Sequence, residues 1–334
     1  MNNYLSLTND EQITIIDQIA GRTGLAPQAI EKDVWVTAIT QIIFTLPFAD
    51  KLVFKGGTSL SKVWNVVERF SEDIDLSLDR NHFGLEGDLT KKQLSKLRKQ
   101  SSLFVKNEFC SALQDAIKYY SLQDFLTIEI EPDGEGDKTY PEPRKVFIRY
   151  QSLFGNLDYI SPEIVLEIGA RALIEPTEKK TMKSLISEHT NIDTSIADSE
   201  IITIVPAKTF LEKAFLLHEI FTGTGSMKAN RKSRHLYDLE KMMDNDFAIK
   251  AVSDHELWNT ILHHRSIFTP IRGIDYTSGI RGNLSIIPPK SVIDEWKQDY
   301  EDMQGTMIHG ESLSFDKLVE RLEELQERFR KFVS

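Results

Sequence analysis

The chain has 334 residues, 40% of them hydrophobic and 27% charged, a composition typical of a soluble globular protein of about two domains. Its formal net charge of −11 is opposite in sign to that of most nucleic-acid-binding proteins, so any nucleic acid must meet a local basic patch. The single cysteine, Cys110, excludes an internal disulfide and a cysteine-based zinc site. No apolar run approaches a membrane span and the N-terminus lacks a signal pattern, so we expect a cytoplasmic protein with no membrane partner.

Two helices are predicted at the N-terminus. The stretch Thr8-Asn9-Asp10-Glu11 has the pattern of a capping box and predicts a helix to about Ala20. Pro27 suits the first turn of a second helix, which we expect to continue to about Leu46. The charged triplet Glu31-Lys32-Asp33 lies early in that helix, and we interpret it as a solvated turn.

A glycine-rich turn follows a short apolar strand. Residues 52–54 form the strand end, and Gly56 and Gly57 then allow the backbone to turn sharply and to approach a ligand closely. We expect Thr58 or Ser59 to cap the next helix, whose first amides would face an anion such as a phosphate.

A second strand is predicted after this helix, and it carries paired carboxylates. Asp73, Asp75 and Ser77 share one face of that strand, while the opposite face is apolar. Two carboxylates side by side repel each other unless a positive charge lies between them, and aspartate is a poor strand former. A bound Mg²⁺ explains the pattern economically, and a solvent-facing edge strand is the alternative.

The middle of the chain predicts one long helix and three strands. The helix covers about 90–120, and its basic start is interpreted as a solvated face. Strands are predicted near 125–131, 145–151 and 163–168. In the last of these, Glu163 and Glu167 share one face, and a surface strand is one interpretation of that pattern.

Helices dominate from about residue 176 onward. One short strand is expected at 201–205, followed by helices at 206–221, 254–267, 290–302 and 313–332, the last with apolar residues at core spacing. Lys213 is the only cation in an apolar helical run, so it either extends to the surface or meets an anion.

Four segments together resemble a known family. The segments 54–62 and 69–76, with fifteen residues between Gly57 and Asp73, are similar to the nucleotidyltransferase superfamily and to its AbiEii/AbiGii branch of type IV toxins. The segments 205–213 and 231–239 resemble the second and third blocks of that branch.

The resemblance implies a Mg²⁺-dependent transfer from an NTP to RNA, most plausibly the tRNA 3′ end, by a toxin neutralised by an AbiEi-like antitoxin. It also implies that Lys213 and Asp238 are active-site residues, and that a carboxylate on a neighbouring strand, Glu167 or else Glu163, is the third metal ligand. Many members have an aspartate where this chain has His235, which leaves open whether Asp238 acts alone. Similar charged triplets precede the glycine turn in that branch, so the resemblance offers a supporting role as the alternative for Glu31-Lys32-Asp33.

We therefore expect an α+β fold, with a nucleotidyltransferase-like mixed sheet flanked by helices at 1–175 and a mainly helical domain at 176–334. In this interpretation Mg²⁺ is held by carboxylates, and Asp75 also accepts the proton of the attacking hydroxyl. The expected metal ligands are Asp73, Asp75 and Glu167, the catalytic residues Asp73, Asp75, Lys213 and Asp238, and the nucleotide-binding residues Gly56, Gly57, Thr58, Ser59, Lys62, Ser71 and Arg234. The alternatives are transfer to a protein or small molecule, and a non-catalytic nucleotide-binding module.

Overall fold

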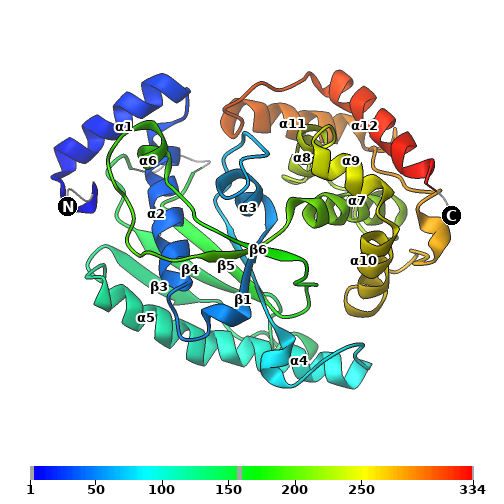
Figure 1. Ribbon diagram of the computed structural model, residues 1–334, viewed down its shortest axis with the longest axis horizontal. Helices are drawn as coiled ribbons and strands as arrows, with labels where there is room; N and C mark the ends of the chain where they lie inside the picture. The colour runs from blue at the N-terminus through cyan, green and yellow to red at the C-terminus, as the bar shows by residue number, and fades with distance from the viewer. Residues whose placement is uncertain (1–3, 156–159, 333–334) are drawn as a thin grey trace. The chain divides into compact units, whose positions relative to one another are not determined.

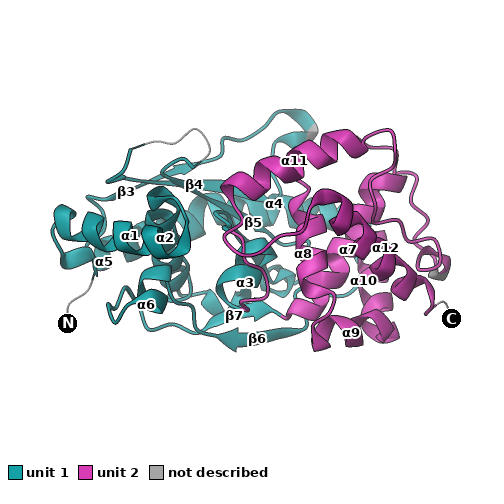
Figure 2. Ribbon diagram, turned by 90° about the horizontal axis from the view of Figure 1, so that it is seen from above, with its two compact units in different colours: residues 1–63, 70–204 teal, residues 64–69, 205–334 magenta. Residues whose placement is uncertain are grey.

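A computed structural model describes residues 4–155 and 160–332 of the chain. Contacts divide the chain into two compact units, which Figure 2 shows in different colours. Unit 1 comprises residues 1–63 and 70–204, and unit 2 comprises residues 64–69 and 205–334. The chain therefore enters unit 2 for one short segment and returns to unit 1 just before the predicted aspartate strand.

Unit 1 is built on a mixed sheet, as expected. Within the described residues its seven strands have the order β3-β4-β5-β2-β1-β7-β6. The β2–β5 and β1–β7 pairs are parallel, and the other neighbouring pairs are antiparallel. The strands are β1 Leu52–Lys55, β2 Ile74–Leu78, β3 Leu126–Ile130, β4 Arg144–Tyr150, β5 Glu163–Gly169, β6 Thr177–Lys180 and β7 Ile201–Ile204.

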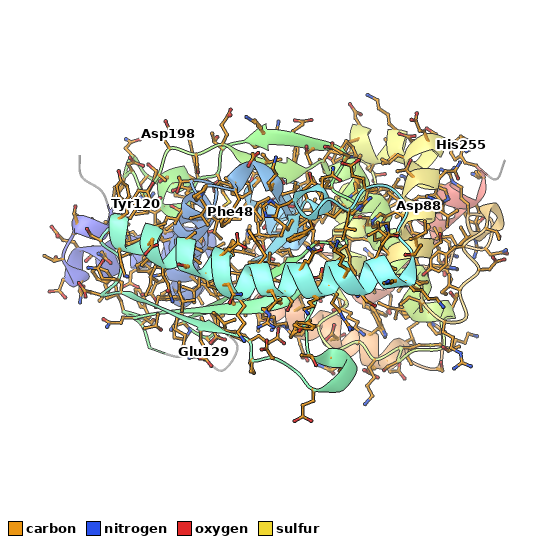
Figure 3. The ribbon with its side chains drawn as sticks, turned by 90° about the horizontal axis from the view of Figure 1, so that it is seen from below. Phe48, Asp88, Tyr120, Glu129, Asp198 and His255 are labelled. Carbon is orange, nitrogen blue, oxygen red and sulfur yellow. The ribbon has the colours of Figure 1, made fainter. Side chains whose placement is uncertain are left out.

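Helices cover both faces of this sheet. Figure 1 shows α1, α2 and α6 on one side and α4 and α5 on the other, and Figure 3 shows α4 and α5 running as one long rod. A π-helical turn at Val105–Phe109 joins these two helices within the predicted 90–120 helix. The helices are α1 Asn9–Thr23, α2 Pro27–Ile43, α3 Gly56–Lys62, α4 Lys91–Phe104, α5 Cys110–Tyr119 and α6 Leu185–His189.

The predicted start of α1 is confirmed in detail. The Thr8 side chain accepts a hydrogen bond from the Glu11 backbone, and the Glu11 carboxylate accepts one from the Thr8 backbone N–H at 2.8 Å. These reciprocal bonds satisfy donors that a helix start otherwise leaves without partners. The basic start of α4 is exposed as expected at Lys91, Lys92, Lys96 and Lys99, whereas Arg98 of the same cluster is half-buried.

The sheet extends beyond the domain boundary that we expected at residue 175. Strand β7 pairs in parallel with β1, with Thr203 opposite Phe54, and β6 pairs with β7 in turn. Residues 176–204 therefore belong to unit 1. The sequence did not indicate β6 because Thr177–Lys180 is a polar edge strand with no apolar alternation.

Unit 2 is mainly helical, as expected. Its helices pack around an aromatic core in which the Trp258 ring lies 4.3 Å from that of Phe215 and 5.6 Å from that of Phe329. The apolar stripe predicted for the last helix is buried from Phe315 to Phe329. The helices are α7 Pro206–Thr222, α8 Arg234–Met242, α9 Asp246–Ser253, α10 His255–Phe268, α11 Ile293–Thr306 and α12 Phe315–Arg330.

The segment Trp64–Arg69 joins unit 2 through its backbone. The Glu68 carbonyl accepts a hydrogen bond from the His309 N–H at 3.2 Å, and Arg69 forms an isolated β-bridge with Ile308. In residues 4–155 and 160–332, no helix combines the length and the apolar character needed to cross a membrane.

Candidate active site

The glycine turn lies directly against an aspartate of the next strand. Strand β1 ends at Lys55, and Gly56 follows with a φ of +81°, a conformation that favours glycine. A Cβ atom at Gly56 would collide with the Asp75 carboxylate oxygen Oδ2. Only glycine therefore allows this approach between the turn and the carboxylate.

The hydroxyl groups of the turn bind the protein's own atoms. Thr58 Oγ1 lies 2.5 Å from the Asp73 carbonyl and 2.8 Å from Ser71 Oγ, and Ser59 Oγ donates to the Gly56 carbonyl at 2.9 Å. The expectation that Thr58 or Ser59 caps the helix is wrong, since α3 begins at Gly56 with Lys55 as its N-cap. The Thr58 hydroxyl instead fastens the turn to the segment that carries Asp73, and the Ser59 hydroxyl bonds within the turn.

A row of four charged residues crosses four neighbouring strands. In the register of the sheet, Asp75 is opposite Lys55 on one side and Glu167 on the other, and Glu167 is opposite Lys145. Lys145 Nζ lies 2.9 Å from Glu167 Oε1, and Lys55 Nζ lies 3.8 Å from Asp75 Oδ1. We call Lys55, Asp75, Glu167 and Lys145 the charged row.

The charged row lies on the sheet face opposite α4. Arg144 immediately precedes Lys145 in β4, so its side chain points to the other face of the sheet. Its Nε donates to Ser102 Oγ of α4 at 2.8 Å. Hydrogen bonding to Glu167 raises the pKa of Lys145, and Asp73 adds to this effect through its charge. Asp73, which precedes β2, is therefore close enough to Lys145 to act on it electrostatically.

The structure distinguishes between the two glutamates considered on β5. Glu163 is opposite Arg149, and its carboxylate lies 2.8 Å from Arg149 Nε. Glu167 is opposite Asp75 instead. Of the two, Glu167 is the one that the register brings to the aspartate strand.

The charged triplet of α2 is buried, so the interpretation as a solvated turn is wrong. Glu31, Lys32 and Asp33 are 3%, 1% and 3% exposed. Lys32 Nζ lies 2.6 Å from a carboxylate oxygen of Glu72, and Asp33 lies 2.5 Å from Lys62 Nζ. Lys62, a predicted nucleotide-binding residue, is thus paired with Asp33 in this structure.

The second group of predicted residues lies in unit 2. Asp238 of α8 is fully buried, and both of its oxygens are bound by Arg69, from Nε at 2.7 Å and from Nη2 at 2.8 Å. Lys213 of α7 lies 2.8 Å from the same carboxylate. Lys213 is only 6% exposed, so it meets an anion and does not extend to the surface. We call Arg69, Lys213 and Asp238 the buried cluster.

Burial and charge act in opposite directions in the buried cluster. Burial alone would raise the pKa of Asp238, but Arg69 and Lys213 lower it well below its usual range. Burial lowers the pKa of Lys213, and Asp238 offsets only part of that effect. Asp238 is therefore ionised between two cations and holds both of them in place.

Two further residues of α8 lie beside Lys213. His235 Nδ1 is 3.3 Å from Lys213 Nζ, and burial together with the charge of Lys213 lowers the pKa of the imidazole. The ring is therefore neutral and accepts a hydrogen bond from the ammonium group at Nδ1. Arg234, the first residue of α8, contributes a further positive charge near both groups.

A family model described as "Nucleotidyl transferase AbiEii toxin, Type IV TA system" matches residues 39–321, well over half of the chain. The chain belongs to the AbiEii family. It is a nucleotidyltransferase of a toxin family, and this membership implies a nucleoside triphosphate substrate and an antitoxin partner. No curated protein matches the chain.

Among solved structures, MenT4, a nucleotidyltransferase toxin from Mycobacterium tuberculosis H37Rv, is similar to this AbiEii-family chain. The sequence identity is 15%, and the match covers 96% of this chain and 99% of that one with a TM-score of 0.45. A similarity of this size carries no further conclusion.

Nucleotidyltransferases typically use a divalent metal, and the AbiEii chain has oxygen donors suited to one. Asp75 of β2 and Glu167 of β5 are neighbours in the sheet, Asp73 precedes β2, and the Gly56 backbone lies directly against the Asp75 carboxylate. As placed in the described residues, no three histidine, cysteine or carboxylate side chains are gathered around one point. The oxygen donors fit a hard cation once Asp75 and Glu167 turn away from Lys55 and Lys145 and converge with Asp73.

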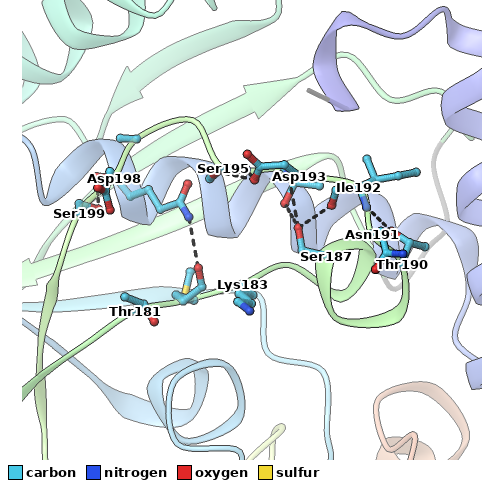
Figure 4. Close-up of a pocket in the computed structure, with 14 residues that line it drawn as sticks. Thr181, Lys183, Ser187, Thr190, Asn191, Ile192, Asp193, Ser195, Asp198 and Ser199 are labelled. Carbon is cyan, nitrogen blue, oxygen red and sulfur yellow. Dashed lines mark hydrogen bonds between the residues drawn. The ribbon is translucent and has the colours of Figure 1, made fainter. Parts of the chain in front are cut away.

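A cavity of about 550 Å³ in unit 1 is lined by none of the candidate site residues within the described ranges. Gln41 and the segment 181–199 form its walls (Figure 4). Gln41 Nε2 donates to the Met182 carbonyl at 3.2 Å, and Ser187 Oγ donates to the Ile192 carbonyl at 3.0 Å. These hydrogen bonds connect parts of the segment 181–199 to one another and to α2.

Sequence reasoning about this AbiEii-family protein missed several charged partners. Arg69 lies four residues before Asp73, and an arginine so close to the aspartate strand is a usable signal. Lys55 precedes the glycine turn and was equally visible. The partner of Lys145 could not be predicted, because it depends on the register of β4 and β5. The partner of Glu72 could not be predicted either, because it depends on the packing of α2.

Proposed function

We propose that this AbiEii-family nucleotidyltransferase transfers a nucleotide from an NTP to the 3′ end of tRNA, with Mg²⁺, and so blocks translation in the cytoplasm. An AbiEi-like antitoxin neutralises it. The observation that carries the proposal is the charged row, where Asp75 and Glu167 are adjacent on one face beside the glycine turn. Such a placement of carboxylates suits a metal-bound triphosphate.

The carboxylates of Asp73, Asp75 and Glu167 would hold the metal. When bound, Mg²⁺ supplies positive charge that offsets the charge of the triphosphate oxygens. Gly56 and Gly57 let the backbone approach the phosphates, while Thr58, Ser59 and Ser71 keep the turn in shape, consistent with their internal hydrogen bonds. Lys62, paired with Asp33, supports α3 behind this turn.

The reaction forms one bond at the α-phosphorus and breaks one. The acceptor hydroxyl attacks, its proton passes to Asp75, and pyrophosphate leaves with the bridging oxygen. Lys213 and Arg234 supply positive charge to phosphate oxygens during the attack. Asp238 is a positioning residue in this scheme, because it is fully buried and bound by Arg69 and Lys213.

Chain connectivity supports a shared role in the reaction for the proposed metal ligands and the buried cluster. Arg69 precedes Asp73 by four residues, a stretch that spans at most about 14 Å when fully extended. A residue of the buried cluster and a proposed metal ligand are thus joined by a short stretch of backbone.

The net charge of the chain bears on which acceptor the enzyme uses. The net charge of −11 favours a protein or small-molecule acceptor over RNA, unless a local basic patch binds the RNA. Each α-labelled NTP should therefore be incubated with Mg²⁺ and either total tRNA or a protein extract. We expect labelled tRNA, and label on protein alone would favour the other acceptor.

A matched pair of variants tests the proposed metal site in the same assay. We expect Asp75→Asn to lose at least about 10²-fold in transfer rate, because it removes a ligand and the proposed base. Asp88→Asn, at the exposed aspartate labelled in Figure 3, should transfer at the wild-type rate. Equal rates in both variants would remove the charged row from the mechanism.

A further inference from the structure

The charged row contains two lysines that the proposed chemistry does not use. Lys55 and Lys145 flank Asp75 and Glu167, so the charges across the four strands are positive, negative, negative and positive. Residues directly opposite in a sheet point to the same side, and two like charges there destabilise the pairing. Each carboxylate therefore has its own lysine, and the row is neutral as a whole.

These ion pairs are exposed enough to be exchanged. The side chains of Lys55 and Asp75 are 31% and 25% exposed, and those of Lys145 and Glu167 are 42% and 32% exposed. Pairs open to solvent to this degree are weak, and a lysine ammonium on its flexible stem changes position easily. A divalent cation can therefore replace a lysine at either carboxylate at little cost.

A lysine released in this way remains beside the substrate. Lys55 is the residue immediately before Gly56, and it ends β1 at the turn. The Lys145 backbone is held by a hydrogen bond from its N–H to the Glu131 carboxylate at 2.9 Å, which keeps the residue in place when its side chain moves. A triphosphate carries more negative charge than one divalent cation neutralises, so nearby ammonium groups find new partners on it.

We propose that Lys55 and Lys145 are exchangeable counter-ions, which bind Asp75 and Glu167 before substrate arrives and transfer to the triphosphate oxygens when the metal and nucleotide bind. This inference rests on the proposed function and adds two phosphate-binding residues to it. It requires that each lysine compete with the metal for a carboxylate in the nucleotide-free protein. It also requires that each lysine strengthen nucleotide binding once the metal is present.

The opposite signs of these two effects provide the test. Lys145→Met and Lys55→Met keep the apolar stem and remove the charge. Mn²⁺ binding to the nucleotide-free protein, measured by electron paramagnetic resonance, should tighten by about 2- to 10-fold in either variant. Binding of α,β-methylene nucleoside triphosphates with Mn²⁺, measured by calorimetry for all four bases, should weaken about 10-fold.

Two control variants show whether the effects are specific to the charged row and to the lysine charge. Lys179→Met removes a lysine of β6 whose partner, Glu200, is also exposed, and it should change neither affinity. Lys145→Arg keeps the charge and should restore nucleotide binding. Weakening of metal and nucleotide binding together, or no change in Mn²⁺ affinity, would overturn the exchange while leaving the proposed function standing. A wild-type protein that binds neither Mn²⁺ nor any of the four analogues would overturn both.

Discussion

The buried cluster of unit 2 and the charged row of unit 1 use the same chemical groups in different surroundings. Arg69 and Asp238 of the cluster are 1% and 0% exposed, whereas every side chain of the charged row is at least 25% exposed. A buried carboxylate must keep its cations because water cannot replace them. A half-exposed carboxylate can change partners. The comparison suggests that the cluster maintains a fixed geometry, while the row can receive a ligand.

The largest expected effect comes from removing the central charge of the buried cluster. Asp238→Asn leaves Arg69 and Lys213 buried side by side without a counter-charge, and we expect the free energy of unfolding to fall by about 5 kcal/mol. Urea denaturation measures this loss. Asp244→Asn, at an exposed carboxylate paired with Arg321 and Arg328 in the same unit, is the control and should cost less than about 1 kcal/mol. Equal midpoints in the two variants would contradict the comparison.

The Lys32–Glu72 pair extends the comparison to a second buried site. Lys32→Met leaves the Glu72 carboxylate largely buried without its cation, and we expect a loss of about 3 kcal/mol in unfolding free energy. The double variant Lys32→Met/Glu72→Gln should recover part of that loss, because the carboxylate charge is then no longer buried. A single variant as stable as the wild type would mean that this pair contributes nothing to the fold.

The lowered pKa of Asp238 predicts a specific dependence of stability on pH. The stabilisation from this group is present above the unfolded-state pKa of about 3.9, and it is lost as the pH falls toward the lower folded-state value. Below pH 4 the wild type should lose up to about 1.4 kcal/mol per pH unit more than Asp238→Asn. Unfolding free energies measured from pH 5 to pH 3 test this difference, and parallel curves would exclude it.

The smallest effect on stability is expected in the charged row. Lys145→Met should change the free energy of unfolding by no more than about 0.5 kcal/mol, because its ion pair with Glu167 is open to solvent. Urea denaturation in the absence of metal and nucleotide is the measurement. A loss as large as that expected for Lys32→Met would show that the row is a structural ion pair.

Features that depend on residues close together in the sequence could be predicted from sequence patterns. The capping box at Thr8 and the apolar stripe of α12 appear where expected, because each depends on residues within a few positions. The predicted aspartate strand is present but shorter than expected, since β2 begins at Ile74 and leaves Asp73 outside it, and Ser77 is buried. The mixed sheet and the helical second unit were also predictable from these elements.

Features that depend on distant partners could not be predicted. Glu31-Lys32-Asp33 resembles any solvated helix turn, and it is buried because partners come from distant segments. These are the Glu72 and Lys62 side chains, the Ser152 hydroxyl and the Leu153 backbone N–H. Strand β6 has no apolar signal, since it forms a polar edge. The position of Lys145 opposite Glu167 follows from a strand register that no motif indicates.

Nucleotidyl transfer to RNA is the central claim, and it can be tested by following the two ends of the triphosphate separately. Purified protein, Mg²⁺ and uncharged tRNA would be incubated with NTP labelled at the α-phosphate and, in parallel, at the γ-phosphate. We predict that the α-label enters tRNA and that the γ-label leaves as pyrophosphate, and that Asp73→Ala abolishes both changes. Transfer of the γ-label to tRNA or protein would contradict the account, because it would make the protein a phosphoryltransferase.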